Sequence, residues 1–427
     1  MSKLSKNDQA WNSLFYELDI LQHIKQAGYF EISSSVINRY REARLMTKFD
    51  YSSQLPEIFK KHQLGILPNS RGTYIISDFT IFHAFKGHHP PIVNVAFPNH
   101  IESIDYNNIT SESTAINCAF IAGILTDFTG ETQLYPTING RMGSSVFNFN
   151  ISTTSGSISM SVNNAQLEID AGYEGKEAIY LIEAKNVLSD DFLIRQLYYP
   201  FRLWSGQSRK RIHPIFLTYT NGLFHLREYT FDKADDYNSI RQVKEKRYAF
   251  TGEAIDIESI RNIIRNNPCV IEPSVPFPQA NSFERLINLC ELLHIHGSLK
   301  HTFITDNYAF DARQTNYYTD AGRYLGVIGK QKINGDVEFF LTATGEKLFD
   351  APIARRTRQF IELILSHTVF KEVFKAYLQQ RQMPCKDEIV SIMQSSQLYN
   401  INSEATYYRR ASTIAQWVNW MLEQIES

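Results

Sequence analysis

The chain has 427 residues, 43% of them hydrophobic, and its 43 Lys and Arg residues nearly balance its 45 Asp and Glu residues. This length predicts two or three domains with sizeable cores. The net charge of −2 argues against binding nucleic acid through overall positive charge, so any such surface has to be a local basic patch. The sequence has no apolar run long enough to span a membrane, Met1–Gln9 lacks the apolar core of a signal peptide, and the four cysteines are widely scattered. We therefore expect a cytoplasmic protein with reduced thiols.

Residues 1–100 predict an N-terminal domain with a basic surface. Trp11–Gln26 and Leu55–His62 have helical patterns, and Gly72–Ile76 has the pattern of a strand. The same range contains a cluster of basic residues, namely Arg39, Arg41, Arg44, Lys48, Lys60, Lys61 and Arg71. Solvation explains each charge taken singly, whereas the whole cluster indicates a binding surface.

Residues 101–250 predict a core of helices and strands. A helix is expected from the sequence Ser-Glu-Ser-Thr at positions 111–114 through Phe128, followed by strands at Ser145–Ile151 and Ile158–Val162. The apolar run Ala178–Ala184 follows a turn-like stretch at 174–177, which predicts the second strand of a hairpin.

Glu183 and Lys185 end this apolar strand and lie on one of its faces, because side chains alternate along a strand. An isolated Glu-x-Lys pair is usually a solvated surface pair, but unpaired charge beside an apolar strand is costly, which favours a site. A turn centred on residues 175–176 places Asp170 opposite Leu181 and diagonal to Glu183, about 7–8 Å away. Two carboxylates and one ammonium then converge.

This grouping suits Mg²⁺, which takes oxygen ligands and usually binds one or two carboxylates together with substrate phosphate. Asp170 and Glu183 are the expected carboxylate ligands, the Ala184 carbonyl is a third oxygen, and Glu168 is an additional candidate. The metal would acidify a water and neutralise charge on a scissile phosphate, with Lys185 orienting or deprotonating that water.

A helix is expected after the pair, capped by Asp190 or Asp191, and it places Arg195 and Gln196 near the site. Pro200 should kink or end its regular part. The apolar stripe of this helix is Leu193, Leu197 and Phe201. The core then continues with a strand at His213–Tyr219, a turn at Asn221–Gly222 and a strand at Leu223–Phe231.

This order of elements, the spacing Asp170…Glu183-Ala184-Lys185 and the helix with Arg195-Gln196 resemble the PD-(D/E)xK nuclease superfamily and, within it, the type II restriction endonucleases. Arg41–Phe79 and Tyr407–Trp420 also resemble segments of restriction enzymes.

The resemblance implies an α/β (α+β) nuclease core with a mixed sheet. It also implies metal ligation by Asp170 and Glu183, a catalytic Lys185, and supporting roles for Glu112 and Gln196. The sequence departs from the superfamily pattern at Ile169, where proline is usual. Beside such a core, the basic N-terminal cluster, with Arg44 and Lys48, is expected to face DNA.

Residues 251–281 predict a linker, because the segment Asn267–Asn281 is rich in proline. Residues 282–427 predict a helical C-terminal domain. Helices at 282–294 and 311–325, then a hairpin over 329–341 turning at Asn334–Gly335, follow the order of a winged helix. Arg313 and Gln314 would begin the helix that reads bases.

Further polar residues of this domain are expected to contact DNA, namely Asn316, Tyr317, Arg409 and Arg410. The alternative is a plain helical domain with a solvated polar face. The last helix, 405–423, also carries Trp417 and Trp420, which we expect in the core. His294, His296 and His301 are better explained by polar packing than by a metal site.

The sequence therefore predicts a Mg²⁺-dependent, sequence-specific endonuclease of double-stranded DNA from a restriction-modification system. We expect a homodimer with a DNA methyltransferase as genetic partner. The alternatives are a DNA-binding regulator with a degenerate nuclease fold, and a nuclease that acts in repair or on RNA.

Overall fold

The computed structural model describes the chain except for residues 1–4, 88–89, 253–254, 308–309, 311 and 426–427. It divides into two compact units. Unit 1 comprises Met1–His100, Ser111–Tyr219 and Leu223–Ala249, and unit 2 comprises Ile101–Thr110, Thr220–Gly222 and Phe250–Ser427. None of the helices in the described ranges is long and apolar enough to cross a membrane.

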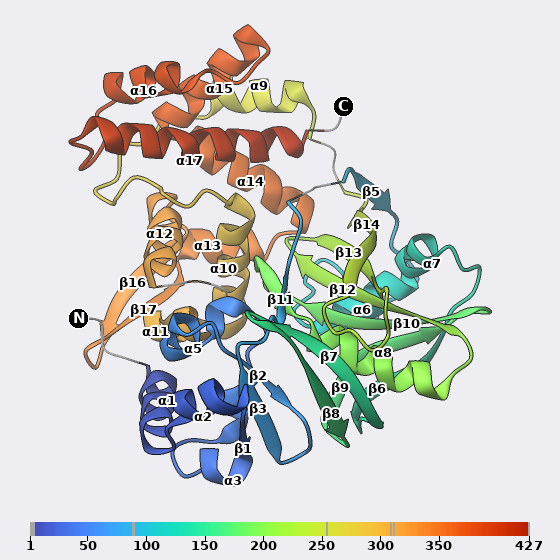
Figure 1. Cartoon of the computed structure of the whole chain (residues 1–427). Helices are drawn as coiled ribbons and strands as arrows, with labels where there is room; N and C mark the ends of the chain where they lie inside the picture. The colour runs from blue at the N-terminus through green and yellow to red at the C-terminus, as the bar shows by residue number, and fades with distance from the viewer. Residues whose placement is uncertain (1–4, 88–89, 253–254, 308–309, 311, 426–427) are drawn as a thin grey trace. The chain divides into compact units, whose positions relative to one another are not determined.

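A seven-stranded sheet with the order β5-β14-β13-β12-β10-β9-β6 is the centre of unit 1 (Figure 1). Its strands are β5 (Ile92–Val95), β6 (Tyr135–Gly143), β9 (Gln166–Glu174), β10 (Ala178–Lys185), β12 (Arg211–Thr220), β13 (Leu223–Phe231) and β14 (Ile240–Phe250). β10 runs parallel to β12 and antiparallel to β9, so the expected mixed sheet is confirmed. β10 is buried over nearly its whole length, as its continuous apolar sequence requires.

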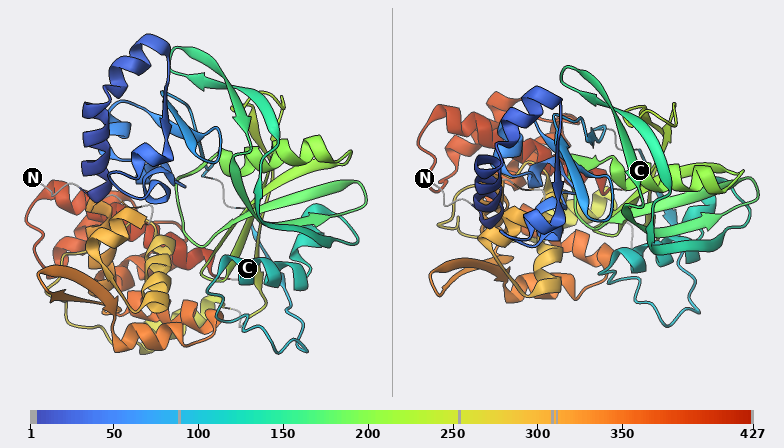
Figure 2. Two further views of the ribbon diagram at one scale, coloured as in Figure 1. Left: turned by 90° about the horizontal axis from the view of Figure 1, so that it is seen from below. Right: turned by 60° about the horizontal axis from the view of Figure 1, so that its bottom comes forward.

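Helices cover both faces of this sheet, with α8 on one face and the α6–α7 pair on the other (Figure 2). They are α6 (Glu112–Ile121), α7 (Ile124–Thr129) and α8 (Arg195–Gln207). The single helix expected from 111 to 128 is wrong, because Gly123 adopts a left-handed φ of 76° and separates α6 from α7.

The start of α8 also differs from the expected one. Asp191–Leu193 forms a short strand, β11, that pairs with β4 (Phe82–Ala84), and no side chain caps α8. Asp191 accepts a hydrogen bond from Ser52 N instead (2.9 Å). Pro200 lies inside α8, which continues to Gln207.

The two strands expected at 145–151 and 158–162 are β7 (Val146–Thr153) and β8 (Gly156–Asn163), which pair as a hairpin and lie beside a small N-terminal sheet (Figure 2). That sheet has the order β1-β3-β2, with β1 (Phe30–Ser33), β2 (Gly65–Pro68) and β3 (Thr73–Ser77). Asn163 N donates to Asn69 O at 2.8 Å, and Thr80 N donates to Ser152 O at 2.9 Å.

The remaining N-terminal elements are short helices: α1 (Lys6–Glu17), α2 (Ile20–Ala27), α3 (Ser34–Ile37), α4 (Ala43–Thr47), η1 (Ser52–Gln54) and α5 (Glu57–Lys61). The single helix expected over Trp11–Gln26 is wrong, since Asp19 adopts a left-handed φ of 45° between α1 and α2.

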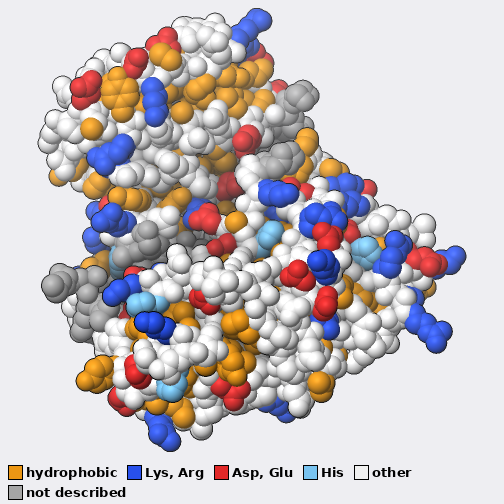
Figure 3. Space-filling model, in the orientation of Figure 1, with side chains coloured by type: hydrophobic (Ala, Val, Ile, Leu, Met, Phe, Trp, Pro, Cys, Tyr) orange, Lys and Arg blue, Asp and Glu red, His pale blue; other side chains and the backbone are white. Residues whose placement is uncertain are grey.

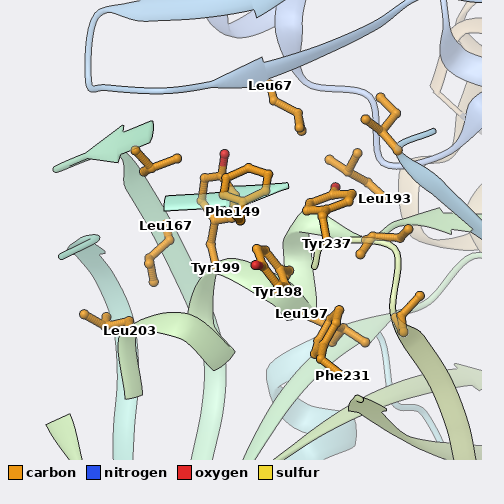
Figure 4. Close-up of a cluster of buried hydrophobic side chains, with 14 of the residues drawn as sticks. Leu67, Phe149, Leu167, Leu193, Leu197, Tyr198, Tyr199, Leu203, Phe231 and Tyr237 are labelled. Carbon is orange, nitrogen blue, oxygen red and sulfur yellow. The ribbon is translucent and has the colours of Figure 1, made fainter. Parts of the chain in front are cut away.

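One hydrophobic cluster joins the N-terminal sheet, the β7–β8 hairpin and α8 to the large sheet (Figure 4). Tyr198 and Tyr199 of α8 are fully buried in it, next to Phe149 of β7. Leu67 of β2 belongs to the same cluster. Most buried apolar residues of the N-terminal segment, among them Trp11, Phe59 and Ile76, form a second cluster of their own, whereas Leu67 and Ile75 belong to the cluster of the large sheet.

Unit 2 is mostly helical. Its helices are α9 (Ile257–Asn266), α10 (Phe283–His296), α11 (His301–Asn307), α12 (Ala312–Tyr324), α13 (Ala343–Phe349), α14 (Ile353–Leu365), α15 (Thr368–Gln380), α16 (Lys386–Ser395) and α17 (Glu404–Glu423). A three-stranded sheet has the order β15-β17-β16, with β15 (Ser298–Lys300), β16 (Ile328–Ile333) and β17 (Asp336–Leu341). Asp311, the expected first residue of a helix, lies outside the described residues.

The range 251–281, expected to be a linker, contains α9, whose buried residues are Ile260, Ile263 and Ile264. The end of that range packs on α17, where Trp417 Nε1 donates to Ala280 O at 2.7 Å. Trp417 and Trp420 are buried, as expected from the sequence.

His367 gives unit 2 a dependence on pH. Its imidazole stacks on Tyr324 at 4.2 Å, and burial lowers its pKa to about 4. Below the ordinary pKa of 6.5 the unfolded chain binds a proton that the folded chain does not, so the free energy of unfolding should fall as the pH drops from 6.5 toward 4. His367→Phe, which keeps a stacked ring, is expected to reduce that slope by about 1.4 kcal/mol per pH unit. Urea unfolding of both proteins at several pH values measures the difference, and equal slopes would contradict it.

Candidate functional site

β9 and β10 carry the residues expected to form the site, but in another register. Leu181 pairs with Gly172 and not with Asp170, and the backbone pairing ends at the pair that follows. The turn is therefore centred between residues 176 and 177, one residue later than expected. This shift moves the partners by two residues, which keeps each side chain on its face and brings Asp170 nearer to Glu183.

A bulge in β9 lies next to Asp170. Between Ile169 and Gly172, β9 covers three residue steps where its partner strand β6 covers only two. Bulges beside active sites commonly re-aim a side chain. Here Asp170 Oδ2 accepts a hydrogen bond from Ala184 N at 2.8 Å, where the backbone ladder has ended. The carboxylate therefore lies against the end of β10.

Glu183 is a carboxylate that is only 8% exposed and is held by two donors. Lys185 Nζ lies 2.5 Å from its Oε1, and Gln196 Nε2, in the first turn of α8, donates to the same oxygen at 2.7 Å. Burial, together with the carboxylates of Asp170 and Asp50, raises the pKa of Glu183 to about 8 against the opposing charge of Lys185.

Lys185 is the buried cation of the site. Burial alone would lower the pKa of its ammonium, but the carboxylates of Glu183, Asp50 and Glu112 raise it well above the ordinary value. Lys185 therefore remains charged, and it serves as a shared counter-ion for acidic groups from several elements.

Glu112, in the first turn of α6, joins the same group. Burial raises its pKa and the charge of Lys185 opposes that shift. Asp170 and Asp50 also raise the pKa, whereas Lys48, an exposed residue expected to contact DNA, lowers it. The charges of Lys185 and Asp170 thus act on Glu112, which lies near the hairpin.

Asp50 and Tyr51 belong to the site although the sequence did not indicate them. Asp50 Oδ1 accepts a hydrogen bond from Gln196 Nε2 at 3.2 Å, across 146 residues of sequence. Tyr51 is 3% exposed, and its hydroxyl has no hydrogen-bond partner among the described residues. No local pattern in the sequence links this segment to the hairpin, so only the tertiary structure reveals it.

Glu168, an additional expected ligand, lies at the edge of the site. It pairs with Arg141 at 3.2 Å, and both side chains are 54% exposed. Glu168 also lines one pocket together with Glu183 and Gln196. Leu197 belongs to the apolar wall of this pocket. Its carboxylate is therefore near the buried group without belonging to it.

The buried group carries more negative than positive charge, which suits a divalent cation. Its acidic residues are Asp50, Glu112, Asp170 and Glu183, opposed by Lys185. The buried Oε1 of Gln196 is a further oxygen without a hydrogen-bond partner in the described part of the chain. Carboxylate and amide oxygens are the kind of ligand that Mg²⁺ takes.

Three of these oxygens, Asp50 Oδ1, Asp170 Oδ2 and Glu183 Oε1, already accept hydrogen bonds from the protein. Among the residues that the structure describes, no group of three or more His, Cys, Asp or Glu side chains is arranged to hold a metal ion. Because Lys185 and Gln196 both bind Glu183 Oε1, a cation that used this oxygen would have to displace one of them.

The residues expected to read DNA in unit 2 lie on α12 and α17. Arg313 and Asn316 of α12 are exposed, whereas Gln314 and Tyr317 are half-buried. Asn316 Oδ1 lies 3.1 Å from His301 Nε2, which accounts for that histidine by polar packing.

On α17, Arg409 is exposed, whereas Arg410 donates to Gln279 Oε1 and is half-buried, with a pKa lowered by burial. Arg409 is therefore the better placed of the two for a phosphate. In unit 1, Arg44 is exposed on α4. On the face drawn in Figure 3, basic and acidic side chains are interspersed.

Three stretches of the chain match families of domains of unknown function. Residues 8–76 match the family DUF6996, residues 77–249 match DUF6997, and residues 285–426 match DUF7226. No curated protein and no solved structure matches the chain. The buried group draws on the first two stretches, since Asp50 and Tyr51 lie in one and Glu183 lies in the other.

The excess of negative charge leads to a prediction that does not depend on enzymatic activity. Mg²⁺ or Ca²⁺ should raise the melting temperature of the protein, because an ion that binds only the folded state stabilises it by about 2.7 kcal/mol at 100 times its Kd. Asp170→Asn should lose most of this shift in a thermal melt. Glu174→Gln is the matched control, since Glu174 lies on the same strand but pairs with Lys210 at 2.6 Å. An unchanged shift in Asp170→Asn would place the ion elsewhere.

Proposed function

We propose that this chain is a Mg²⁺-dependent endonuclease that hydrolyses phosphodiester bonds of double-stranded DNA at specific sequences, like the type II restriction enzymes. The observation that supports this proposal best is the Glu183–Lys185 pair. Its two side chains are 10% and 11% exposed at the end of an apolar strand, with further carboxylates beside them. Burying two charges is costly, and groups of mutually perturbed ionisable residues are typical of active sites.

Each residue of the group has a role in this proposal. Asp170 and Glu183 hold the metal, with the Ala184 carbonyl as a further oxygen. Bound Mg²⁺ supplies a more acidic water and neutralises charge on the phosphate. When Glu183 turns from Lys185 to a cation, the ammonium becomes available to orient the attacking water or to stabilise the phosphate. Gln196 orients the water, and Glu112 supports the site from α6.

The order of elements supports a PD-(D/E)xK core. A helix, α6, precedes the β9–β10 hairpin, and α8 and β12 follow it in a mixed sheet. The Asp170, Glu183 and Lys185 side chains come from this hairpin, as in that superfamily.

We assign sequence recognition to unit 2. There α10, β15, α11, α12 and the β16–β17 hairpin follow one another in the order of a winged helix. In this proposal α12 is the recognition helix, Arg313 and Gln314 contact bases, and Asn316 and Tyr317 lie next to them. The alternative, a plain helical domain, predicts no loss of specificity on changing these residues.

Two further expectations follow from the proposal that the chain is a restriction enzyme. Cutting both strands at a palindrome is most simply done by a two-fold dimer, so we propose a homodimer. A gene for a DNA methyltransferase is expected beside the gene for this chain. Neighbouring repair genes in its place would favour a repair nuclease, and preferential cleavage of RNA would favour the RNA alternative.

A second candidate is a DNA-binding regulator with a degenerate nuclease fold. This candidate is favoured because Lys185 and Gln196 already donate to Glu183 Oε1, the oxygen that a metal ion would use. This candidate predicts sequence-specific binding without cleavage.

Cleavage assays on supercoiled plasmid separate the two candidates. The wild type is expected to cut with Mg²⁺, whereas Glu183→Gln, Lys185→Ala and Asp170→Asn should lose cleavage and retain DNA binding in gel shifts of the same preparations. Lys210→Ala is the matched control, because Lys210 also pairs with a glutamate of this hairpin. Equal cutting by the wild type and the Glu183 and Lys185 variants would refute the site, and binding without cutting by the wild type would support the regulator.

Recognition is tested by competition across a randomised DNA library at two salt concentrations. Arg313→Ala and Gln314→Ala should relax the preference at one or two base pairs, by roughly 1–3 kcal/mol each. Arg409→Ala should weaken binding to all sequences and lower the salt slope by about one. Arg358→Ala, which removes an exposed arginine of α14 paired with Glu362, is the control. Unchanged preference and affinity in the α12 variants would move specificity out of that helix.

A further inference from the structure

The first turn of α8 presents one amide to two carboxylates that come from distant parts of the chain. Gln196 Nε2 donates to Glu183 Oε1 at 2.7 Å and to Asp50 Oδ1 at 3.2 Å. A side-chain amide nitrogen has two hydrogens, so the two acceptors use both of them. This arrangement fixes which end of the amide faces the carboxylates, and leaves Oε1 of Gln196 directed elsewhere.

Asp50 is itself fixed by contacts to the same region. Leu193 N, just before α8, donates to Asp50 O at 2.9 Å, and the side chain of Gln54 accepts from Asp50 N at 2.8 Å. On the far side of Tyr51, Ser52 N donates to Asp191 Oδ1 at 2.9 Å. The segment is therefore tied to the residues before α8 through Asp50 and Ser52, and the Asp50 backbone is held in place before any ligand binds.

We propose that Asp50 is a positioning residue of the active site, which acts by holding the Gln196 amide so that its Oε1 faces the reacting water or phosphate. This inference rests on the proposed nuclease function and adds to it. The site is then composite: residues 8–76, which match a domain family of their own, supply a group on which catalysis by residues 77–249 depends.

The buried atoms around Asp50 are consistent with this role. Gln196 Oε1 has no hydrogen-bond partner in the described ranges, and neither has the hydroxyl of Tyr51. Buried polar atoms without partners are uncommon in folded proteins, and a catalytic role or a bound water is among their explanations. A water or substrate oxygen would satisfy Gln196 Oε1 only if Asp50 and Glu183 keep its nitrogen turned away.

The test is a double-mutant cycle in the full-length protein, measured by steady-state cleavage of a DNA substrate with Mg²⁺. Asp50→Ala is expected to lower kcat by about 10- to 100-fold, the usual effect of removing a residue that orients an active-site group, and to leave KM for DNA unchanged. Asp50→Asn keeps an oxygen acceptor for Gln196 and should retain more activity. Because Asp50 acts through Gln196, the double variant Asp50→Ala/Gln196→Ala should be no slower than Gln196→Ala alone.

Asp78→Asn is the control for loosening of the N-terminal segment. Asp78 accepts a hydrogen bond from Thr154 N at 3.0 Å. It therefore joins the N-terminal segment to the β7–β8 hairpin without contacting Gln196. This variant should lower the melting temperature while its kcat remains that of the wild type.

The outcomes distinguish this inference from the proposed function. If the wild type cuts DNA and Asp50→Ala cuts equally fast, or if the losses in kcat of the two single variants multiply in the double variant, the positioning role is overturned and the nuclease stands. If the wild type itself does not cut DNA with Mg²⁺, the proposed function fails, and this role fails with it.

Discussion

The unit 1 site depends on the burial of the Glu183–Lys185 ion pair. Removing two charges from water costs free energy, which is offset only when the geometry is good and further hydrogen bonds satisfy the remaining atoms. Here those bonds come from α8 and from the end of β9, where the backbone pairing has stopped. The two polar groups are the Asp170 carboxylate, next to the bulge in β9, and the Gln196 amide, in the first turn of α8.

The same pair accounts for the charge balance of the site. One ammonium cannot neutralise all of the surrounding carboxylates, so burial and mutual repulsion raise the pKa values of Glu183 and Glu112. A divalent cation would relieve this repulsion, and a proton would relieve part of it. A site built only for stability would have fewer acidic residues, because replacing buried charges with apolar groups is often neutral or stabilising.

Local sequence patterns predicted the β9–β10 hairpin, the faces of its side chains and the approach of Gln196, because strand alternation and helix order act over short distances, whereas Glu112 was expected only from the resemblance to the nuclease superfamily. The register was wrong by two residues, because the turn is centred between residues 176 and 177, where Gly175 N donates to Ala178 O, and not on residues 175–176. The breaks at Asp19 and Gly123 were missed because the apolar pattern continues across them while the backbone does not. Asp50 could not be found, since its contact with Gln196 spans 146 residues.

The position of Asp50 also bears on where the functional unit ends. Family boundaries divide the chain between residues 76 and 77, but the hydrophobic cluster crosses that division, with Leu67 on one side and Phe149 and Tyr199 on the other. A shared core resists separation, because cutting it exposes apolar surface on both parts. The Asp50 carboxylate, from the first part, also binds the Gln196 amide that holds Glu183. Packing and polar contacts therefore both join the two parts into one functional unit. Residues 8–76 and 77–249 together form the folded site, and neither stretch alone contains all the residues that surround Lys185.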